Sequence, residues 1–396
     1  MVAMKAVFDP GSVSMLDGKD LTSVVSALSV FLEPYRPLMA RAEQREHLGI
    51  MVGGLLSDLE RKSVEPIAAR SQLPRRPLQR FVGDGHWSDE RVRDKIQEEV
   101  AAAFGDGEAV YVLDSSGFHK QGPESVGVAR QWCGRLGKID NCQLGYFLVY
   151  SAARGDALVG AQLYLPESWA DDPARRAAVY VPADRPFRKG WELADELIVA
   201  AAVRLPHAWV VGDDEFGRPS EFRDRLADRG ERYLLEVPSN TRVRRPPHWA
   251  GRSAKWGTVR KRLKSQAPHK WTRVHLRDGE KGPIVVEAFA TRVETTRKGR
   301  PPRLETLLVM RNLNHTQSWY FLANGDAPLE VETLVAVAAH RHHIEQVFEV
   351  AKGEVGLDHY EVRSWVGWHH HMTLSMLAHW FLVGQRRRLG KKKLLP

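Results

Sequence analysis

The segment between Glu108 and Pro238 most narrows the folds open to this chain, because strand-like and helix-like patterns alternate along it. It opens with EAVYVLD, a short apolar run that ends in an acid, and continues with NCQLGYFLVYSAARGDALVGAQLYLP, which predicts two strands joined at Arg154–Asp156. Helical spacing follows in WELADELIVAAAVRL. The segment closes with HAWVVGDDEFGRPSEFRDRLADRGERYLLEVP, which predicts strand, glycine-containing loop, helix and strand. Such alternation is typical of an α/β fold built on a sheet.

Different patterns flank this segment on both sides. The residues up to Phe104 are mostly helical in spacing, and a strongly basic stretch after the segment precedes two strand-like runs, PIVVEAFATRVE and LETLLVMRNL. Helical spacing returns near Leu329, and the chain ends in QRRRLGKKKLLP. We therefore expect four parts: a helical region over 1–104, a core over 105–238 and 327–385, a basic β-rich insertion over 239–326, and a basic tail over 386–396.

The helical region contains a candidate DNA-binding motif. In EPIAARSQLPRRPLQRFVGDGHW, a short helix over Ile67–Arg70 meets a Ser-Gln-Leu-Pro break, and a second helix opens near Pro77. These are the proportions of a helix-turn-helix, with arginines on its second element at Arg75, Arg76 and Arg80. An ordinary helical pair with solvated arginines explains the same pattern, so both interpretations stay open.

Charge and cysteine content narrow the classes of function. Lys and Arg number 58 against 49 Asp and Glu, and the resulting net charge of +9 favours a polyanionic partner, nucleic acid before membrane. The two cysteines, Cys133 and Cys142, indicate neither a disulfide framework nor a Cys-rich zinc site. The first residues lack the pattern of a secretion signal, and no long charge-free apolar run is present. These features predict a cytosolic protein directed at nucleic acid.

One stretch near the C-terminal end, HRHHIEQVFEVAKGEVGLDHY, predicts a helix with charge beside its apolar face. Arg341, Glu345 and Lys352 fall within roughly 40° of one another around the helix axis. The adjoining apolar stripe consists of Ile344, Phe348, Ala351 and Val355. Glu345 is therefore expected at the border between core and solvent, where a catalytic carboxylate is useful. The alternative is an ion pair between Arg341 and Glu345 on a solvated face.

Three acids occupy positions that a tertiary fold can bring together. Asp114 ends the first predicted strand, Asp213 ends a later one, and Glu345 lies on the late helix. Carboxylates at the ends of neighbouring strands meet in space, and a helix packed on the sheet can add a third. Such oxygen donors suit Mg²⁺ or Mn²⁺. Two such ions about 3.5–4 Å apart can support phosphodiester cleavage, so the sequence predicts a metal-dependent, DNA-cutting enzyme.

Each acid also has an alternative interpretation. Asp114 could cap the turn formed by Ser115–Gly117, and Asp213 could be a helix N-cap. Asp214 competes with Asp213, because adjacent residues of a strand point to opposite faces.

Side chains near Glu345 also have competing interpretations. Glu349 and Glu354 compete with it, although the helix angle and the spacing to the Arg and Lys favour Glu345. Zinc binding is a further alternative for the nearby histidines, but they lack the HExxH spacing and a partner Cys pair. We expect solvated or phosphate-contacting side chains at His340, His342, His343 and 369–371.

Three stretches, in chain order, are VLDSSGFHKQGPESVGVARQWCGRLGKIDNCQLG, VVGDDEFGRPSEF and HRHHIEQVFEVAKGEVGLDHYEVRSW. They resemble the acid-bearing blocks of IS4-like DDE transposases, most of all the IS701 family. The superfamily signature in the third block is Tyr, two residues, Arg, three residues, Glu, six residues, Lys. At those spacings the chain has Arg341, Glu345 and Lys352. Ala338 replaces the Tyr, and Phe216-Gly217 stands where the second block usually has Tyr-Gly.

The resemblance spans roughly Glu108 to Leu382 and implies a site and a cofactor. It implies an RNase H-like catalytic core in which Asp114, Asp213 and Glu345 are the catalytic residues and hold two Mg²⁺ (or Mn²⁺) ions. Arg341 and Lys352 would grip the DNA backbone on either side of the scissile phosphate.

The resemblance also implies DNA contacts outside the triad. A tryptophan of the insertion is expected to stack on a displaced base near the cut, and the candidates are Trp249, Trp256 and Trp271. Each of these could equally be an ordinary core or surface tryptophan. Near the first Asp, Lys120, Arg130 and Gln131 could bind DNA or be solvated.

The expected activity is that of a transposase. It would cleave transposon ends by metal-dependent hydrolysis, and the freed 3′ hydroxyl would then attack target DNA. The expected partner is double-stranded DNA bound by a homodimer, in the bacterial cytoplasm at the nucleoid and without a membrane. The alternatives are a non-transposing RNase H-like DNA nuclease and a catalytically inactive DNA-binding derivative.

Overall fold

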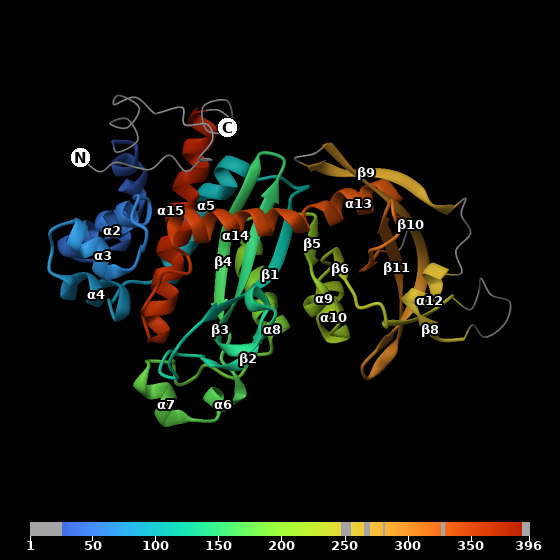
Figure 1. Cartoon of the computed structure of the whole chain (residues 1–396), viewed down its shortest axis with the longest axis horizontal. Coiled ribbons are helices and arrows are strands. Elements are labelled where there is room, and N and C mark those ends of the chain that lie inside the picture. Colours follow the sequence, from blue (N-terminus) through green and yellow to red (C-terminus); the bar gives the residue numbers. More distant parts are fainter. Residues whose placement is uncertain (1–25, 247–254, 265–269, 280–281, 326–328, 390–396) are drawn as a thin grey trace.

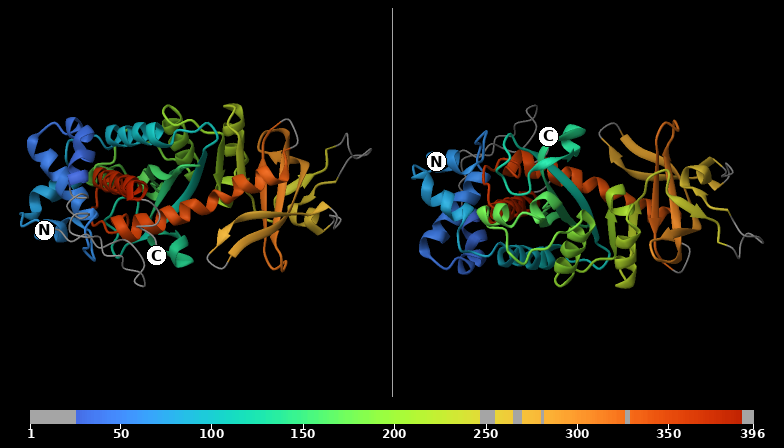
Figure 2. Two further views of the ribbon diagram at one scale, coloured as in Figure 1. Left: turned by 90° about the horizontal axis from the view of Figure 1, so that it is seen from above. Right: turned by 90° about the horizontal axis from the view of Figure 1, so that it is seen from below.

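The computed structural model describes residues 26–246, 255–264, 270–279, 282–325 and 329–389 (Figure 1). Figures 1 and 2 show an elongated molecule, with the N-terminal helices at one end, a strand-rich part at the other, and a mixed helix-and-strand body between them. The α/β class expected from the alternating patterns is confirmed. No helix in these residue ranges combines the length and the apolarity that crossing a membrane requires.

The N-terminal part is helical, with elements η1 Glu33–Leu38, α2 Ala42–Leu55, α3 Val64–Arg70, α4 Arg75–Gly83 and α5 Asp89–Phe104. The predicted break between two short helices is confirmed between α3 and α4, where Gln72 adopts a φ of 54°. Helix α5 begins where the Ser88 hydroxyl accepts a hydrogen bond from the Arg91 N–H, and two acids follow in its first turn. Both features stabilise a helix N-terminus.

The body is built from six strands, β1 Val110–His119, β2 Ala129–Cys133, β3 Lys138–Ala152, β4 Gly155–Leu163, β5 Trp209–Gly212 and β6 Tyr233–Glu236. The helices between them are α6 Glu167–Ala170, α7 Pro173–Ala178, α8 Gly190–Ala202, α9 Asp214–Gly217 and α10 Ser220–Asp228. The predicted hairpin, helix and strand–helix–strand unit are thus confirmed. Strands β1, β5 and β6 run parallel, and β5 is buried at every residue, as parallel strands covered on both faces usually are.

The first strand is longer than the sequence predicted. Strand β1 does not end at Asp114 but continues for five residues to His119. Its parallel ladder with β5 does stop at Leu113, opposite Gly212. The antiparallel ladder with β3 continues to the pair of His119 with Cys142. The polar run after Asp114 lacks apolar alternation, and only its pairing with β3 makes it a strand.

The predicted strand-like runs of the insertion are confirmed as two long strands, β10 Gly282–Arg297 and β11 Arg300–Asn312. The other elements there are β7 Arg242–Arg244, β8 Gly257–Thr258, α12 Val259–Lys264, β9 Thr272–Gly279 and β12 Ser318–Ala323. Strand β12 pairs with β6, so the insertion extends the sheet of the body. Within the described ranges the sheet has twelve strands in the order β2-β3-β1-β5-β6-β12-β11-β10-β7-β8, with β4 beside β3 and β9 beside β10.

Three helices close the described chain, α13 Val331–Ala339, α14 Arg341–Val355 and α15 Trp365–Leu389. Helix α14 confirms the predicted late helix, and its apolar stripe is buried. Alternate residues of β3 face opposite layers. The hydroxyl of Tyr146 reaches Glu215 of α9, whereas the Phe147 ring packs on Phe348 of α14, with 5.1 Å between centroids.

One expectation about the late histidines was wrong. His369, His370 and His371 are 8%, 1% and 2% exposed, so they are neither solvated nor available to phosphates. The two ring nitrogens of His370 lie 3.0 and 2.9 Å from the carbonyl oxygens of Val82 and Trp87. Burial lowers the pKa of all three rings, to about 4 for His369 and His371. His370 and His371 join α15 to the chain around it, and the burial of all three follows from helix packing that local sequence does not show.

A buried ion pair joins the body to the insertion. The Arg223 guanidinium of α10 lies 3.2 Å from the Glu305 carboxylate of β11, and these side chains are 3% and 0% exposed. The Tyr233 hydroxyl donates a 2.5 Å hydrogen bond to the same carboxylate, and Thr295 donates another. A buried charge of this kind is tolerated because it is paired and hydrogen-bonded.

Replacing Glu305 with Ala should lower the free energy of unfolding by about 3–5 kcal/mol, because it leaves the Arg223 guanidinium buried without its partner. Glu361→Ala is the matched control. It removes an exposed ion pair with Arg61 and should cost less than about 1 kcal/mol. Urea denaturation followed by circular dichroism measures both values, and equal losses would contradict a structural role for the buried pair.

Candidate active site

Asp114 and Asp213 lie beside each other at the point where two parallel strands part. Because Leu113 is paired with Gly212, the next residues on β1 and β5 are these two aspartates. Both also make the local contacts that the alternative interpretations expected. Asp114 accepts a 2.7 Å hydrogen bond from the Ser115 N–H, and Asp213 caps α9 by accepting a 3.0 Å bond from the Glu215 N–H. Local capping and proximity to a second acid therefore coexist.

The two aspartates share an unfavourable electrostatic environment. Burial, and next the negative charge of Asp213, raise the pKa of Asp114 to about 7, although Arg341 opposes the shift. Burial also raises the pKa of Asp213, again against the effect of Arg341. Asp214 differs, because its side chain is 43% exposed and pairs with Arg218 at 2.8 Å. Two adjacent, poorly solvated carboxyl groups are an arrangement that a cation would stabilise.

Two further acids at this site escaped prediction. Glu215 accepts hydrogen bonds from the Ser115 hydroxyl, at 2.8 Å, and from the Tyr146 hydroxyl. Glu236 ends β6, one residue beyond the pair of Gly212 with Leu235, which places it next to Asp213 in the register. Burial raises the pKa of both glutamates. The signal for Glu215 was present in the run Asp213–Glu215, which has three consecutive acids after a buried strand.

Glu345 lies apart from the two aspartates. Its side chain is 53% exposed and pairs with the His342 ring at 2.9 Å and with Arg341 at 3.5 Å. The Arg341 guanidinium also lies 3.5 Å from Glu236, so it connects Glu345 to the acids at the strand ends. In the parts of the chain that the structure describes, no three His, Cys, Asp or Glu side chains are grouped so that they could hold a metal ion.

A cavity of about 910 Å³ opens over the aspartates. Asp114, Asp213, Glu215 and Lys352 line it, whereas Glu345 does not. The Lys352 ammonium donates a 2.8 Å hydrogen bond to the Ser116 hydroxyl, and burial lowers its pKa. The cavity therefore combines acids that can bind a cation with a cation that can bind a phosphate.

Of the other predicted DNA-binding side chains near the first Asp, only Gln131 lines this cavity in the part of the chain that the structure describes. The Lys120 ammonium lies 3.6 Å from the centroid of the Tyr360 ring, outside the cavity, and burial lowers its pKa to about 8. Arg130 is exposed on β2. Gln131 lines the cavity and donates a 2.8 Å hydrogen bond to the Cys142 carbonyl.

None of the candidate tryptophans of the insertion lines the cavity where the structure describes it. The Arg244 guanidinium lies 4.7 Å from the centroid of the Trp256 ring. Trp271 packs edge-on against Phe289 and lies 3.8 Å from the guanidinium of Arg311. Trp249 falls outside the described residues.

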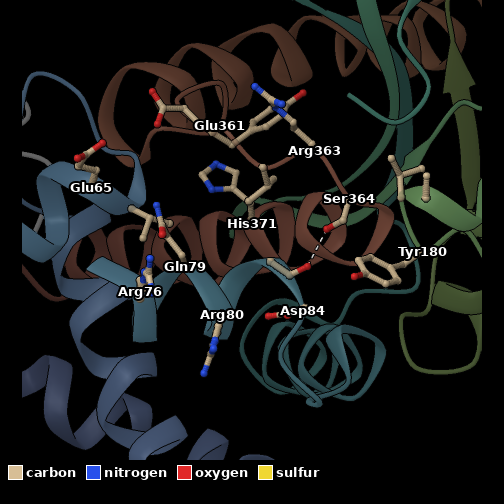
Figure 3. Close-up of a pocket in the computed structure, with 16 residues that line it drawn as sticks. Glu65, Arg76, Gln79, Arg80, Asp84, Tyr180, Glu361, Arg363, Ser364 and His371 are labelled. Atoms are coloured by element: carbon tan, nitrogen blue, oxygen red, sulfur yellow. Dashed lines mark hydrogen bonds between the residues drawn. The ribbon is translucent and has the colours of Figure 1, made fainter. Parts of the chain in front are cut away.

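A second pocket, of about 570 Å³, lies where α4 meets the segment before α15 (Figure 3). Arg76 and Arg80 of α4 and Arg363 line it, and the Ser364 hydroxyl joins its two sides by donating a 2.7 Å hydrogen bond to the Gly83 carbonyl. Neighbouring Arg75 lies outside the lining and pairs at 2.7 Å with Glu65, which lines the pocket together with two further acids, Asp84 and Glu361. Within the described residues, no ion pair joins the three lining arginines to a carboxylate, so these cations can bind phosphates.

Comparison with known proteins gives a family and two relatives. The model of the DDE superfamily endonuclease family matches residues 34–308, which include Asp114 and Asp213 and stop before α14. A probable transposase for insertion sequence element IS701 from Microchaete diplosiphon is 26% identical over 128 residues, or 32% of this chain and 34% of that protein. The piggyBac transposase, in a cryo-EM synaptic complex with hairpin DNA, superposes with a TM-score of 0.44 and 11% identity, covering 93% of this chain and 73% of that one.

The raised pKa of Asp114 predicts a pH-dependent effect of Asp114→Asn. Without metal, the folded protein keeps this carboxyl protonated up to about pH 7, whereas the unfolded chain ionises it near pH 4. The protonated Asp114 carboxyl therefore makes its full contribution to wild-type stability below about pH 4, and this contribution is lost as the pH rises through 7. Relative to wild type, the variant should gain about 1–3 kcal/mol of unfolding free energy between pH 5 and pH 8. Urea denaturation in EDTA measures the difference in unfolding free energy between the two proteins. A difference that does not change with pH would contradict a raised pKa for Asp114.

Proposed function

The chain belongs to the DDE superfamily endonuclease family, and from this premise we propose that it is a transposase. It cleaves DNA at transposon ends in a metal-dependent reaction and joins the freed 3′ ends to target DNA. The observation that carries the proposal is that Asp114 and Asp213 lie side by side, each one residue beyond the parallel ladder of β1 with β5, and line one cavity. The similarity to the IS701 protein supports it, although that similarity covers about a third of the relative's length.

The domain roles follow from the same proposal. We assign residues 105–238 and 327–385 to an RNase H-like catalytic core and 1–104 to a helical DNA-binding region. Residues 239–326 form an insertion that shares the core's sheet through the pairing of β6 with β12. The basic tail, 386–396, lies mostly outside the described residues.

Enzymes of this superfamily depend on divalent metal ions, and the donor chemistry of the cavity fits such a cofactor. Asp114 and Asp213 supply the hard oxygen ligands that Mg²⁺ or Mn²⁺ prefers. When bound, the ions activate a water molecule and stabilise the leaving 3′ oxygen. The two aspartates would hold the ions in place. Their raised pKa values mean that solvent alone stabilises their ionised forms poorly. Lys352 faces the same space and binds a phosphate oxygen beside the cut.

Glu345 is proposed as the third acid of the triad. Its support is the spacing to Arg341 and Lys352 on one face of α14. Its exposed carboxylate must leave Arg341 and His342 to reach the aspartates, and a phosphate bound by Arg341 would release it. Glu215 is the rival, because it already lines the cavity.

Carboxylate-to-amide substitutions separate the two glutamates. Asp114→Asn, Asp213→Asn and Glu345→Gln should each slow Mg²⁺-dependent cleavage by about 100-fold or more, because each removes a metal ligand. Glu215→Gln, the matched control, should slow cleavage by only about tenfold, because it alters a hydrogen bond beside the metal ligands and removes no ligand. Gel assays on duplexes carrying the inverted repeats that border the gene measure cleavage. Normal cutting by Glu345→Gln, with loss in Glu215→Gln, would transfer the third role to Glu215.

A strand-joining assay separates a transposase from a nuclease. The wild-type protein, given pre-cleaved ends and Mg²⁺, should insert them into a supercoiled plasmid, because the 3′ hydroxyl takes the place of water in the same displacement. Cleavage without any joined product would instead favour the non-transposing nuclease.

The unpaired arginines of the second pocket predict the salt dependence of DNA binding. Arg76→Gln and Arg80→Gln should each weaken end binding and lower the slope of log K against log salt by about 1, because each removes one phosphate contact. Arg75→Gln is the matched control and should change the slope less, because Glu65 already neutralises that side chain. Fluorescence anisotropy over a salt series gives the slopes, and equal slopes for all four proteins would remove α4 from the DNA interface.

A further inference from the structure

The hairpin of β2 and β3 carries large apolar side chains in contact with solvent. Trp132 and Ile139 are 61% and 59% exposed, and they face each other across the two strands. Leu136, at the tip, is 41% exposed. Exposed apolar groups gathered in this way mark a surface that binds something.

Trp132 belongs to the cavity over the aspartates. It lines that cavity together with Asp114 and Asp213. The next residue, Cys133, is fully buried, as the alternation of a strand requires. A side chain at Gly117 would lie 2.8 Å from the Cys133 sulfur, so the hairpin packs directly on β1, three residues beyond Asp114. The indole is therefore held on a well-packed base at the rim of the proposed active site.

The surroundings of Trp132 are basic. Arg130 lies two residues away, on the same face of β2 and exposed. Arg135, which is 58% exposed and pairs with Asp358 at 2.6 Å, lines the cavity next to it, and Lys352 lines the cavity from α14. A ligand that matches both a flat apolar face and nearby cations is a nucleotide, with its base on the indole and its phosphates on the cations.

We propose that Trp132 stacks on an unpaired base of the DNA next to the scissile phosphate. The inference rests on the proposed function and adds a positioning residue to it. A base can lie flat on an indole only after it has left the duplex stack, so this contact holds the strand where the aspartates act. Trp256 and Trp271, the described candidates from the insertion, are occupied by Arg244 and by Phe289 and Arg311, and neither reaches the cavity.

The test combines Trp132 variants with abasic DNA. On intact end-containing duplex with Mg²⁺, Trp132→Ala should slow cleavage about tenfold, and Trp132→Phe, which keeps an aromatic face, less than about threefold. Single abasic sites are then placed one at a time around the cut. At one position, wild type and Trp132→Ala should cleave at the same rate, because the base that the indole holds is gone. Leu136→Ala, which trims the same hairpin outside the cavity, should match wild type on every substrate.

Two results would overturn the inference: full activity of Trp132→Ala on intact DNA, or the same loss at every abasic position. Trp132→Ala should unfold at the same temperature as wild type, because the side chain is exposed, and this result excludes misfolding. Wild type that cuts no substrate would contradict the proposed function instead. In that event, DNA binding in EDTA tests base stacking by Trp132. Wild type should prefer a duplex with a single-stranded overhang over a blunt duplex. The inference expects Trp132→Ala to lose that preference, and an unchanged preference would reject it.

Discussion

The proximity of Asp114 to Asp213 is the constraint on which the account of this site depends. Parallel pairing of β1 with β5 places the two acids at adjacent positions, where burial raises the pKa of both and the charge of Asp213 raises that of Asp114 further. An arrangement that costs stability in the metal-free protein persists because the strands on either side are buried and hydrogen-bonded. A divalent cation bound between the two carboxylates would offset this electrostatic cost.

Arg341 supplies positive charge close to the acids of the site. It pairs with Glu236 and Glu345 and opposes the rise in the pKa of both aspartates, so one guanidinium partly neutralises the acids of the site. Metal bound at the aspartates would compete with this guanidinium for the carboxylates, whereas DNA phosphates would compete with the carboxylates for the guanidinium. On the proposal that Glu345 is the third acid, its carboxylate has to leave its partners on α14, Arg341 and His342, before it can reach the cavity.

Much of the body could be predicted from the sequence, because its signals are local. The apolar run before Asp213 marks a buried strand, and the spacing of Ile344, Phe348 and Ala351 marks α14. Other features depend on tertiary pairing. The polar end of β1 is a strand only through β3, and the histidines at 369–371 are buried only because α15 packs against α4, α5 and the elements around them.

The residues of the site likewise divide into those that local sequence marks and those that only tertiary packing brings there. Asp114 and Asp213 could be found because strand ends place acids at one edge of a sheet, and the register of β1 and β5 agrees. Glu236 could not be separated from ordinary surface acids without the register of β5 and β6, whereas Glu215 was marked only by the run of three acids after β5. Trp132 carried no local signal, because its exposure beside the cavity follows from how the hairpin packs on Gly117. The side-chain partners of Glu345 likewise depend on packing rather than on spacing.

The central claim, that Asp114 and Asp213 together bind a divalent cation, is tested most directly by anomalous diffraction. Crystals of the DNA-bound protein are soaked with Mn²⁺ and measured at the manganese edge. We expect an anomalous peak between the two carboxylates, at about 2.0–2.2 Å from an oxygen of each, as for an octahedral oxygen-bound ion. A map in which manganese binds elsewhere, while both aspartates keep only their contacts to protein groups, would contradict the claim.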